Sequence, residues 1–156
     1  MGKNDTDPFQ GYLIHKVLAH SYSVYFLFFL AGVYLDLVFR LDIFHSPLVV
    51  YLGWILLFLA TLLIFWAQKT SRNLSKENLS KENFMQGPYR YTRGPTHLGL
   101  FFLILGFGMT SNAFFIVLFS PIAFLITKFF YLRREEKILE NKYGAPYLEY
   151  KKAVKF

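Results

Sequence analysis

The chain has 156 residues and a formal net charge of +7, and 54% of its residues are hydrophobic, including 19 phenylalanines and 11 tyrosines. A soluble domain of this length could not bury so much apolar surface, and apolar surface that stays exposed marks contact with a membrane or a partner. The chain has no cysteine, which excludes disulfides, thiolate metal sites and a cysteine nucleophile. The composition therefore indicates an integral membrane protein with a single domain.

Four apolar segments follow one another along this single membrane domain, residues 1–156. Each has roughly the 17–25 residues that a helix needs to cross a bilayer core. The last two are separated only by the polar break Thr110–Asn112, which predicts a tight hairpin. We therefore predict an all-α integral membrane fold with four transmembrane helices, a tight hairpin between the third and fourth, and a C-terminal cytoplasmic amphipathic helix. The expected spans are about residues 22–39, 48–67, 95–111 and 113–132, with a cytoplasmic loop at 68–94 and a cytoplasmic tail at 133–156.

Lysine and arginine gather on one side of this topology. Of the 17, 16 fall on the side of the termini and the 68–94 loop, and only Arg40 falls on the other. The positive-inside rule then places both termini in the cytoplasm. Because these charges lie beside membrane spans, we expect anionic lipid head groups as their partners, and no nucleic acid. Asp36 and Arg40 share a helix face, either as a capping ion pair, which we favour, or as a substrate contact.

A stretch of ionisable and backbone-restricting residues, Gly87–Gly99, lies at the predicted boundary between water and lipid. Arg90 and Arg93 are planar, permanently charged donors for a carboxylate or phosphate, or else anchors for lipid head groups. His97 follows Arg93 by one helical turn and is either an interfacial polar residue or a base that titrates near neutral pH. Ionisable groups at such a boundary are a functional-site hypothesis by default.

Two further features belong to the same end and to the third span. Glu135 and Glu136 lie where the fourth span leaves the membrane, either as a solvated turn or as part of a site. Adjacent helical residues point about 100° apart, so one carboxylate would face a site and the other solvent or neighbouring arginines. Carboxylates accept hydrogen bonds from hydroxyl and ammonium groups. Gly106 and Gly108 allow close approach of either a ligand or a neighbouring helix.

These residues resemble a known family. The stretch G-P-Y-R-Y-T-R-G-P-T-H-L-G resembles the G-P-Y-R-Y-x-R-H-P-x-Y-x-G signature of the isoprenylcysteine carboxyl methyltransferase and phospholipid methyltransferase superfamily. The tail from Glu135 to Tyr150 resembles that family's E-E-x-x-L-x-x-x-(F/Y)-G-x-x-Y-x-x-Y ending, and Gly106–Gly108 stands where phospholipid N-methyltransferases carry a G-x-G. The chain departs from the signature at Gly94, where the family commonly has His, and at His97, where it usually has Tyr.

The resemblance implies a membrane methyltransferase that uses S-adenosylmethionine. The acceptor would be lipid-like and would reach the site from the bilayer, as an isoprenylcysteine-type carboxylate or a phospholipid amine. If the glutamate pair and the glycines hold the cofactor, Arg93 and His97, one helical turn apart, are the predicted catalytic residues that meet this acceptor, and no metal site is predicted. The cofactor-binding residues that the resemblance implies are Tyr91, Pro95, Gly99, Gly106, Gly108, Glu135 and Glu136.

Two other functions remain open. One is an NADPH-dependent reductase of the steroid 5-alpha-reductase type, which has a related C-terminal layout, and the other is a non-catalytic membrane scaffold. Binding of S-adenosylmethionine but not NADPH separates the methyltransferase from the reductase. Binding of neither nucleotide favours the scaffold.

Overall fold

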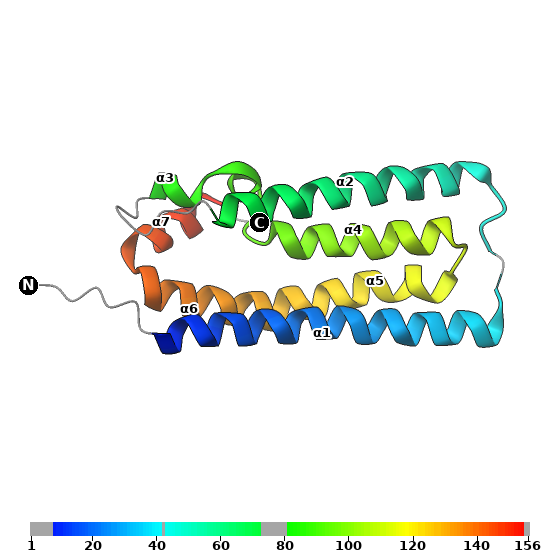
Figure 1. Ribbon diagram of the computed structural model, residues 1–156, viewed down its shortest axis with the longest axis horizontal. Coiled ribbons are helices and arrows are strands. Elements are labelled where there is room, and N and C mark those ends of the chain that lie inside the picture. The colour runs from blue at the N-terminus through cyan, green and yellow to red at the C-terminus, as the bar shows by residue number, and fades with distance from the viewer. Residues whose placement is uncertain (1–7, 42, 73–80, 155–156) are drawn as a thin grey trace, which may run out of the picture.

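The computed structural model describes residues 8–41, 43–72 and 81–154, and all regular structure in these ranges is helical (Figure 1). The predicted all-α class is therefore confirmed. In chain order the elements are α1 (Pro8–Phe39), α2 (Pro47–Arg72), α3 (Lys81–Phe84), the 3-10 helix η1 (Gly87–Arg90), α4 (Pro95–Thr110), α5 (Phe114–Ile126), the π-helical segment η2 (Thr127–Leu132), α6 (Arg133–Tyr143) and α7 (Ala145–Ala153).

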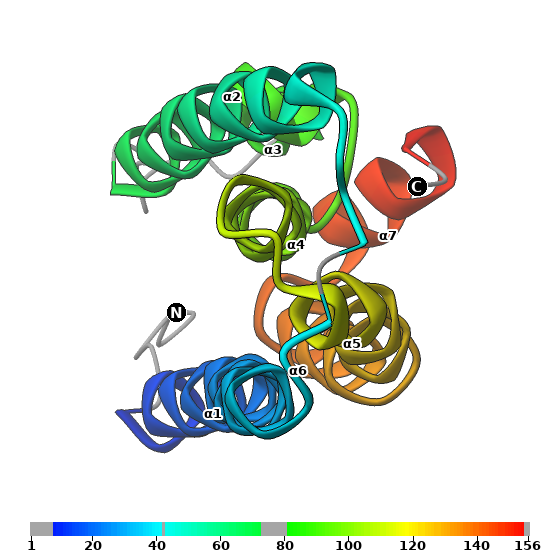
Figure 2. The same ribbon diagram turned by 90° about the vertical axis from the view of Figure 1, so that its right-hand side faces the viewer.

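The helices α1, α2, α4 and α5 form an elongated bundle. In it α4 packs against α2 on one side and α5 on the other, and α1 packs on α5 (Figure 2). Glycines bring these helices together: a Cβ added at Gly106 would lie 2.8 Å from the carbonyl oxygen of Gly53 in α2, and one added at Gly32 would lie 3.0 Å from Cγ1 of Ile116. Small residues at the interface are how helices approach closely in lipid. The glycine positions therefore decide which helix faces meet.

Three of the described helices are long and apolar enough to cross a membrane, over Ala19–Phe39, Pro47–Ser71 and Phe114–Tyr143. Helix α4 is also apolar, but its 16 residues rise only about 24 Å, against a hydrocarbon core of about 30 Å. Of the four expected spans, three therefore have full spanning length, and the third in the chain is a shorter helix packed alongside them.

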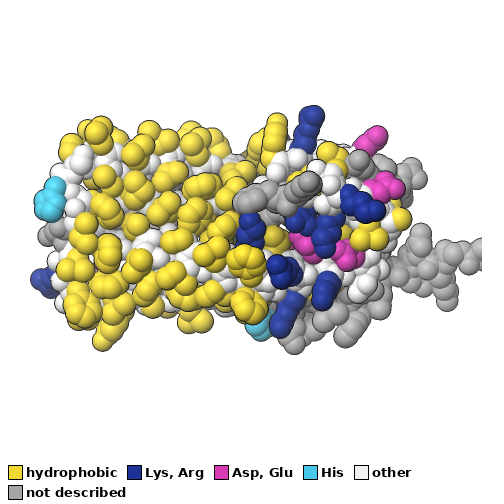
Figure 3. All heavy atoms as spheres, turned by 180° about the vertical axis from the view of Figure 1, so that it is seen from behind, with side chains coloured by type: hydrophobic (Ala, Val, Ile, Leu, Met, Phe, Trp, Pro, Cys, Tyr) yellow, Lys and Arg dark blue, Asp and Glu magenta, His cyan; other side chains and the backbone are white. Residues whose placement is uncertain are grey.

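The face of the bundle that Figure 3 shows is apolar along most of its length. Leu27, Trp54 and Phe58 are each more than 60% exposed, and many aliphatic and aromatic side chains of α1 and α2 accompany them. Water does not support so large an exposed apolar surface, whereas lipid does. The protein is therefore an integral membrane protein, as its composition predicts.

Helix boundaries differ from the expected spans at the polar ends. Helix α1 begins at Pro8 rather than near residue 22, and α2 ends at Arg72 rather than near residue 67. The length of an apolar run reflects the thickness of the lipid core and not the length of the helix. A helix can continue beyond that run into water, because its backbone groups still bond to one another.

The turn between α4 and α5 is held by polar side chains. Asn112 takes a positive φ of 54°, and the carboxylate of Asp36 in α1 accepts the backbone N–H groups of Phe115 (2.9 Å) and Ile116 (3.1 Å) at the start of α5. The first N–H groups of a helix have no partner inside it, so Asp36 caps α5. The expected ion pair between Asp36 and Arg40 was therefore wrong. Both carboxylate oxygens of Asp36 accept hydrogen bonds from α5 instead.

The C-terminal residues fold back over one end of the bundle. Gly144 separates α6 from α7, and its φ of 64° ends the helical path between them. Helix α7 then packs on α3, where the ring of Phe84 lies 5.2 Å from that of Tyr143, 5.5 Å from that of Tyr147 and 5.8 Å from that of Tyr150. This aromatic cluster attaches α7 beside the first turns of α4 and α6 (Figure 1).

Candidate functional site

Charged side chains collect at the end of the bundle where α4 and α6 begin. Figure 3 shows acidic side chains among basic ones at this end, next to the apolar surface. Two segments that are more than forty positions apart in the sequence meet here: the loop that carries Arg93, and the glutamate pair Glu135–Glu136. The site is therefore made by tertiary packing.

Backbone hydrogen bonds hold the Arg93 loop in place. The N–H groups of Tyr91 and Thr92 donate to the carbonyl of Pro88, at 3.1 and 3.2 Å, and the N–H of Gly94 donates to the hydroxyl of Thr92 at 3.3 Å. Pro95 then occupies the start of α4, where its missing N–H costs no helical bond and its fixed φ suits the helix. The loop therefore places Arg93 beside the N-terminal end of α4, which we call the mouth of α4.

Glu136 is the buried centre of an ionic network. Its Oε1 lies 2.8 Å from Nη1 of Arg93, and its Oε2 lies 3.1 Å from Nζ of Lys151 in α7. The side chain of Glu136 is 7% exposed, that of Arg93 18% and that of Lys151 35%. Lys151 also reaches Glu140 at 2.5 Å. Both oxygens of Glu136 are thus engaged by cations, and the removal of one partner would leave a buried charge without compensation.

Glu135 faces a different partner. Its Oε2 lies 3.5 Å from Nε2 of His97, a distance that allows charge attraction but is long for a hydrogen bond. His97 is 5% exposed, and its Nδ1 has no hydrogen-bond partner within the described part of the chain. The side chain of Glu135 is 19% exposed, so this carboxylate remains open to a ligand.

Tyrosines from α1 and from η1 complete the surroundings of His97. Tyr25 donates its hydroxyl to the carbonyl of His97 at 3.1 Å, and its ring is stacked on the imidazole at 6.3 Å between centroids. The ring of Tyr22 lies 6.0 Å from the same imidazole. Burial raises the pKa of the phenol of Tyr89 in η1, and the negative charge of Glu135 raises that pKa further. Four elements, α1, η1, α4 and α6, therefore meet around one histidine and one carboxylate.

Two tyrosines and Lys151 of α7 border this network. Burial raises the pKa of the phenols of Tyr147 and Tyr150, and the negative charge of Glu136 raises that of Tyr147 further. The hydrogen bond to Glu140 raises the pKa of Lys151. The hydroxyl of Tyr150 donates to the carbonyl of Tyr89 at 2.8 Å. The phenols therefore stay neutral and the ammonium stays charged through the physiological range.

The π-helical segment η2 joins α5 to α6 immediately before the glutamate pair. A π-helix bonds i to i+5, so it turns the following residues relative to an uninterrupted α-helix, and such segments often occur at functional sites. Arg133 and Arg134 after it are exposed, and both Glu135 and Glu136 point toward the α4 mouth. The expectation that one glutamate would face solvent or these arginines was therefore wrong.

The structure does not bring the predicted glycines to this site. A Cβ added at Gly99 would lie 2.5 Å from Cγ1 of Ile64 in α2, and one added at Gly108 would lie 2.8 Å from Cγ2 of Val117 in α5. Gly106 packs on α2 and lies nine residues past His97, or about 13 Å along the helix. The space beside Gly99, Gly106 and Gly108 is filled by neighbouring helices. The structure therefore gives these glycines a role in helix packing, and their expected role in cofactor binding stays a prediction.

Three other predicted residues lie in the loop itself. Pro95 is buried at the start of α4, and Tyr91 is 72% exposed at the end of η1. Arg90 is also exposed. Of the predicted residues, the structure thus brings together Arg93, His97, Glu135 and Glu136, with Pro95 as their support, and leaves Tyr91 at the surface.

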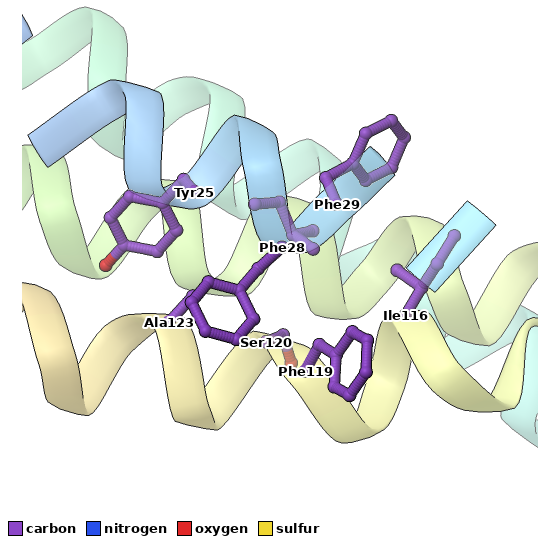
Figure 4. A pocket seen from close by; sticks show the side chains of 8 residues that line it. Tyr25, Phe28, Phe29, Ile116, Phe119, Ser120 and Ala123 are labelled. Atoms are coloured by element: carbon purple, nitrogen blue, oxygen red, sulfur yellow. The ribbon is translucent and has the colours of Figure 1, made fainter. Parts of the chain in front are cut away.

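A narrow apolar crevice lies near the site, between α1 and α5. Tyr25 and Phe28 of α1 face Ser120 and Ala123 of α5 across it (Figure 4). Its empty volume is about 150 Å³, whereas ligand pockets are typically about 300–1,000 Å³. The crevice is therefore too small to hold a nucleoside cofactor, and the charged end of the bundle remains the candidate site.

Sequence reasoning missed Lys151, Tyr22 and Tyr25. Lys151 lies four residues after the buried Tyr147, so the helical period places it on the inward face of α7, but only the fold of α7 over α6 reveals its contact with Glu136. The two tyrosines lie among many apolar residues of α1, where nothing in the local pattern distinguishes them.

Comparison with known protein families matches residues 48–146, more than half of the 156-residue chain, to the family described as phospholipid methyltransferase. No curated protein and no solved structure matches the chain. The matched region runs from α2 through α6 and includes Arg93, His97 and the glutamate pair, and it favours methyl transfer over the reductase. With its spanning helices and this match over most of its length, the chain belongs to the phospholipid methyltransferase family and is a membrane methyltransferase.

Proposed function

We propose that the protein transfers a methyl group from S-adenosylmethionine to the amine head group of a phospholipid. The observation that carries the proposal is the 2.8 Å ion pair between Arg93 and Glu136, which joins two distant segments into one charged site beside the apolar bundle. A buried ion pair contributes little net stability compared with apolar packing, because its desolvation is costly. Its presence at the lipid boundary is better explained by a charged ligand, and the family supplies the class of reaction.

Of the two carboxylates in the site, only that of Glu135 is available to bind the cofactor. Glu135 is partly exposed, and an ionised carboxylate accepts more hydrogen bonds than the single contact with His97 uses. Hydroxyl or ammonium donors of S-adenosylmethionine therefore have an acceptor there. Both oxygens of Glu136 are already engaged, so this residue would hold the site together rather than hold the cofactor.

The chemistry at this site is positioning, charge and one proton transfer. When bound, S-adenosylmethionine supplies an electrophilic methyl group on its sulfonium. Arg93 offers planar donors that suit the phosphate of a phospholipid. An ammonium head group must lose a proton before its nitrogen can attack, and His97 beside Glu135 is placed to accept that proton. Holding acceptor and cofactor in one orientation accounts for much of the expected rate gain.

The electrostatics favour an amine over a carboxylate acceptor. Glu135 and Glu136 put two negative charges at the mouth of α4, and only Glu136 has both oxygens engaged by cations. A cationic ammonium is attracted to Glu135, whereas a second carboxylate placed there is repelled. Methyl transfer to an isoprenylcysteine-type carboxylate is therefore the less suitable reaction for this site.

The proposed topology follows from the same distribution of charge. We infer that α4 completes a fourth, short crossing, that α4 and α5 form the predicted hairpin, and that both termini and the basic end of the bundle face the cytoplasm and its anionic lipids. Reporter fusions at Ser46, at Gln86 and at the C-terminus test this. An external signal at Gln86 would exclude the proposed orientation.

The reaction is tested with purified protein in vesicles that contain phosphatidylethanolamine and methyl-labelled S-adenosylmethionine. We expect mass spectrometry to find the label on the amine head group, and a large loss of label with Arg93→Ala. The exposed Glu149 of α7 provides the control variant Glu149→Gln, which should label lipid at the wild-type rate. Label found only on an isoprenylcysteine carboxylate, or bound cofactor with label on no lipid, would refute the proposal.

A further inference from the structure

Tyr22 lies at the open edge of the site, on a helix outside the family match. Residues 48–146 match the family, whereas Tyr22 and Tyr25 belong to α1 (Pro8–Phe39). The two tyrosines differ in burial: Tyr25 is 2% exposed and Tyr22 is 39% exposed. Tyr25 is therefore buried against His97, whereas part of the Tyr22 side chain is exposed and can contact a ligand.

The ring of Tyr22 lies beside the pair formed by His97 and Glu135. Its centroid lies 6.0 Å from the imidazole of His97, with the two planes tilted by 46°. Glu135 itself lies 3.5 Å from His97. An aromatic face, which is electron-rich, and a carboxylate thus border the same small region. A cation in this region gains from both, because ring quadrupoles and carboxylates attract positive charge.

We propose that the ring of Tyr22 forms one wall of a subsite for the ammonium head group of the acceptor, next to the cofactor-binding Glu135, and contributes a cation–π contact to it. The inference rests on the proposed function, because it assigns the acceptor to this site. Recognition of methylated ammonium groups by aromatic rings is a common use of such contacts. Each added methyl group makes the head group bulkier and less well hydrated, so the ring contributes more to later methylation steps than to the first.

The position of Tyr22 suits a group that arrives from the lipid boundary. Tyr22 is at the start of the apolar part of α1, three residues into the spanning segment Ala19–Phe39. Its neighbours in the site, His97 and Glu135, are less exposed than it is. A head group would therefore meet the Tyr22 ring first and then the carboxylate. Tyr22 is a positioning residue for binding, while His97 takes the proton.

The test compares Tyr22→Leu, which removes the aromatic face, with Tyr22→Phe, which keeps it. For a dimethylated phosphatidylethanolamine acceptor, Tyr22→Leu should raise KM by about three- to tenfold with little change in kcat. Tyr22→Phe should restore most of that loss. The penalty of Tyr22→Leu should be smaller for unmethylated phosphatidylethanolamine. The matched control is Tyr34→Leu, because Tyr34 is also in α1 but is 67% exposed and far from the site.

Two binding measurements separate the possible outcomes. Titration with S-adenosylmethionine and with S-adenosylhomocysteine, which lacks the sulfonium charge, shows whether the ring faces the sulfonium instead. Loss of affinity for S-adenosylmethionine alone in Tyr22→Leu would overturn the assignment to the acceptor. Titration with a short-chain phosphatidylcholine measures head-group binding without turnover, and we expect Tyr22→Leu to weaken it. If that binding depends on Tyr22 but no methyl transfer occurs, the subsite stands and the proposed function fails. If transfer occurs and Tyr22→Leu behaves like Tyr34→Leu, the subsite is wrong and the proposed function stands.

Discussion

Replacing each glutamate of the pair by glutamine should separate stability from cofactor binding. Glu136→Gln removes the negative charge between Arg93 and Lys151, at 2.8 and 3.1 Å, from a side chain that is 7% exposed. Breaking a buried ion pair costs about 3–5 kcal/mol. Because Arg93 and Lys151 keep 18% and 35% of their side-chain surface in solvent, part of that cost is recovered by hydration, and we expect a loss of about 2–3 kcal/mol.

Glu135→Gln should change stability little and weaken cofactor binding. Among the residues that the structure describes, its one close approach to a group that can be cationic is the 3.5 Å distance to His97, and its side chain is 19% exposed. We therefore expect a stability loss below about 1 kcal/mol. If Glu135 accepts hydrogen bonds from the cofactor, losing the charge costs about 1.5–3 kcal/mol of binding, or roughly ten- to hundredfold in affinity.

The assay pairs thermal unfolding in detergent with calorimetric titration of S-adenosylmethionine. For a domain of this size about 1 kcal/mol shifts Tm by about 2–4 °C, so Glu136→Gln should melt about 4–12 °C below wild type. Glu149→Gln on the exposed face of α7 is the control for removing an acidic charge and should change neither quantity. The division of roles would be refuted if Glu136→Gln left Tm unchanged, or if Glu135→Gln left cofactor affinity unchanged.

Three further outcomes follow from the site and the fold. Arg93→Ala and His97→Ala should lower methyl transfer much more than cofactor affinity, and the His97→Ala defect should vary with pH because an amine acceptor needs a neutral base; equal loss of binding and rate in both variants would place them in the cofactor site. Asp36→Ala should lower stability by about 0.5–2 kcal/mol, because it removes the cap of α5, and an unchanged melting temperature would contradict that cap. Gly106→Val should cost about 1–3 kcal/mol, since its Cβ would lie 2.8 Å from a carbonyl of α2; cofactor affinity lost without loss of stability would instead restore Gly106 to the cofactor site.

The ionic network also predicts a pH dependence of stability. The hydrogen bond to Glu140 raises the pKa of Lys151 in the folded protein. A raised pKa means that the contribution is fully present below the unfolded pKa of about 10.4 and is lost as the pH rises through the higher folded value. The difference in Tm between wild type and Lys151→Met should therefore be constant at neutral pH and shrink in alkaline solution. A difference that persists at alkaline pH would mean that Lys151 stabilises by packing alone.

The sequence anticipates the fold wherever local chemistry is enough. Apolar runs as long as a bilayer is thick identify α1, α2 and α5 as membrane helices, and the polar break after residue 109 locates the turn before α5. The break between α6 and α7 follows from Gly144, whose φ of 64° few other residues adopt. Helix α4 ends within one residue of its expected span, at Thr110, but its 16 residues are fewer than a full crossing of the lipid core needs.

By itself the sequence determined the membrane-helical class, the family resemblance and the four residues Arg93, His97, Glu135 and Glu136 that the structure brings together. These follow from composition and from short motifs, which are properties of neighbouring residues. Only the tertiary structure decided that Glu136 is the buried centre of the ionic network and that the glycines of α4 serve helix packing. It also decided the contributions of Lys151, Tyr22 and Tyr25, because these depend on helices far apart in the chain lying side by side, and the pairing of helix faces is set by where small side chains allow close approach.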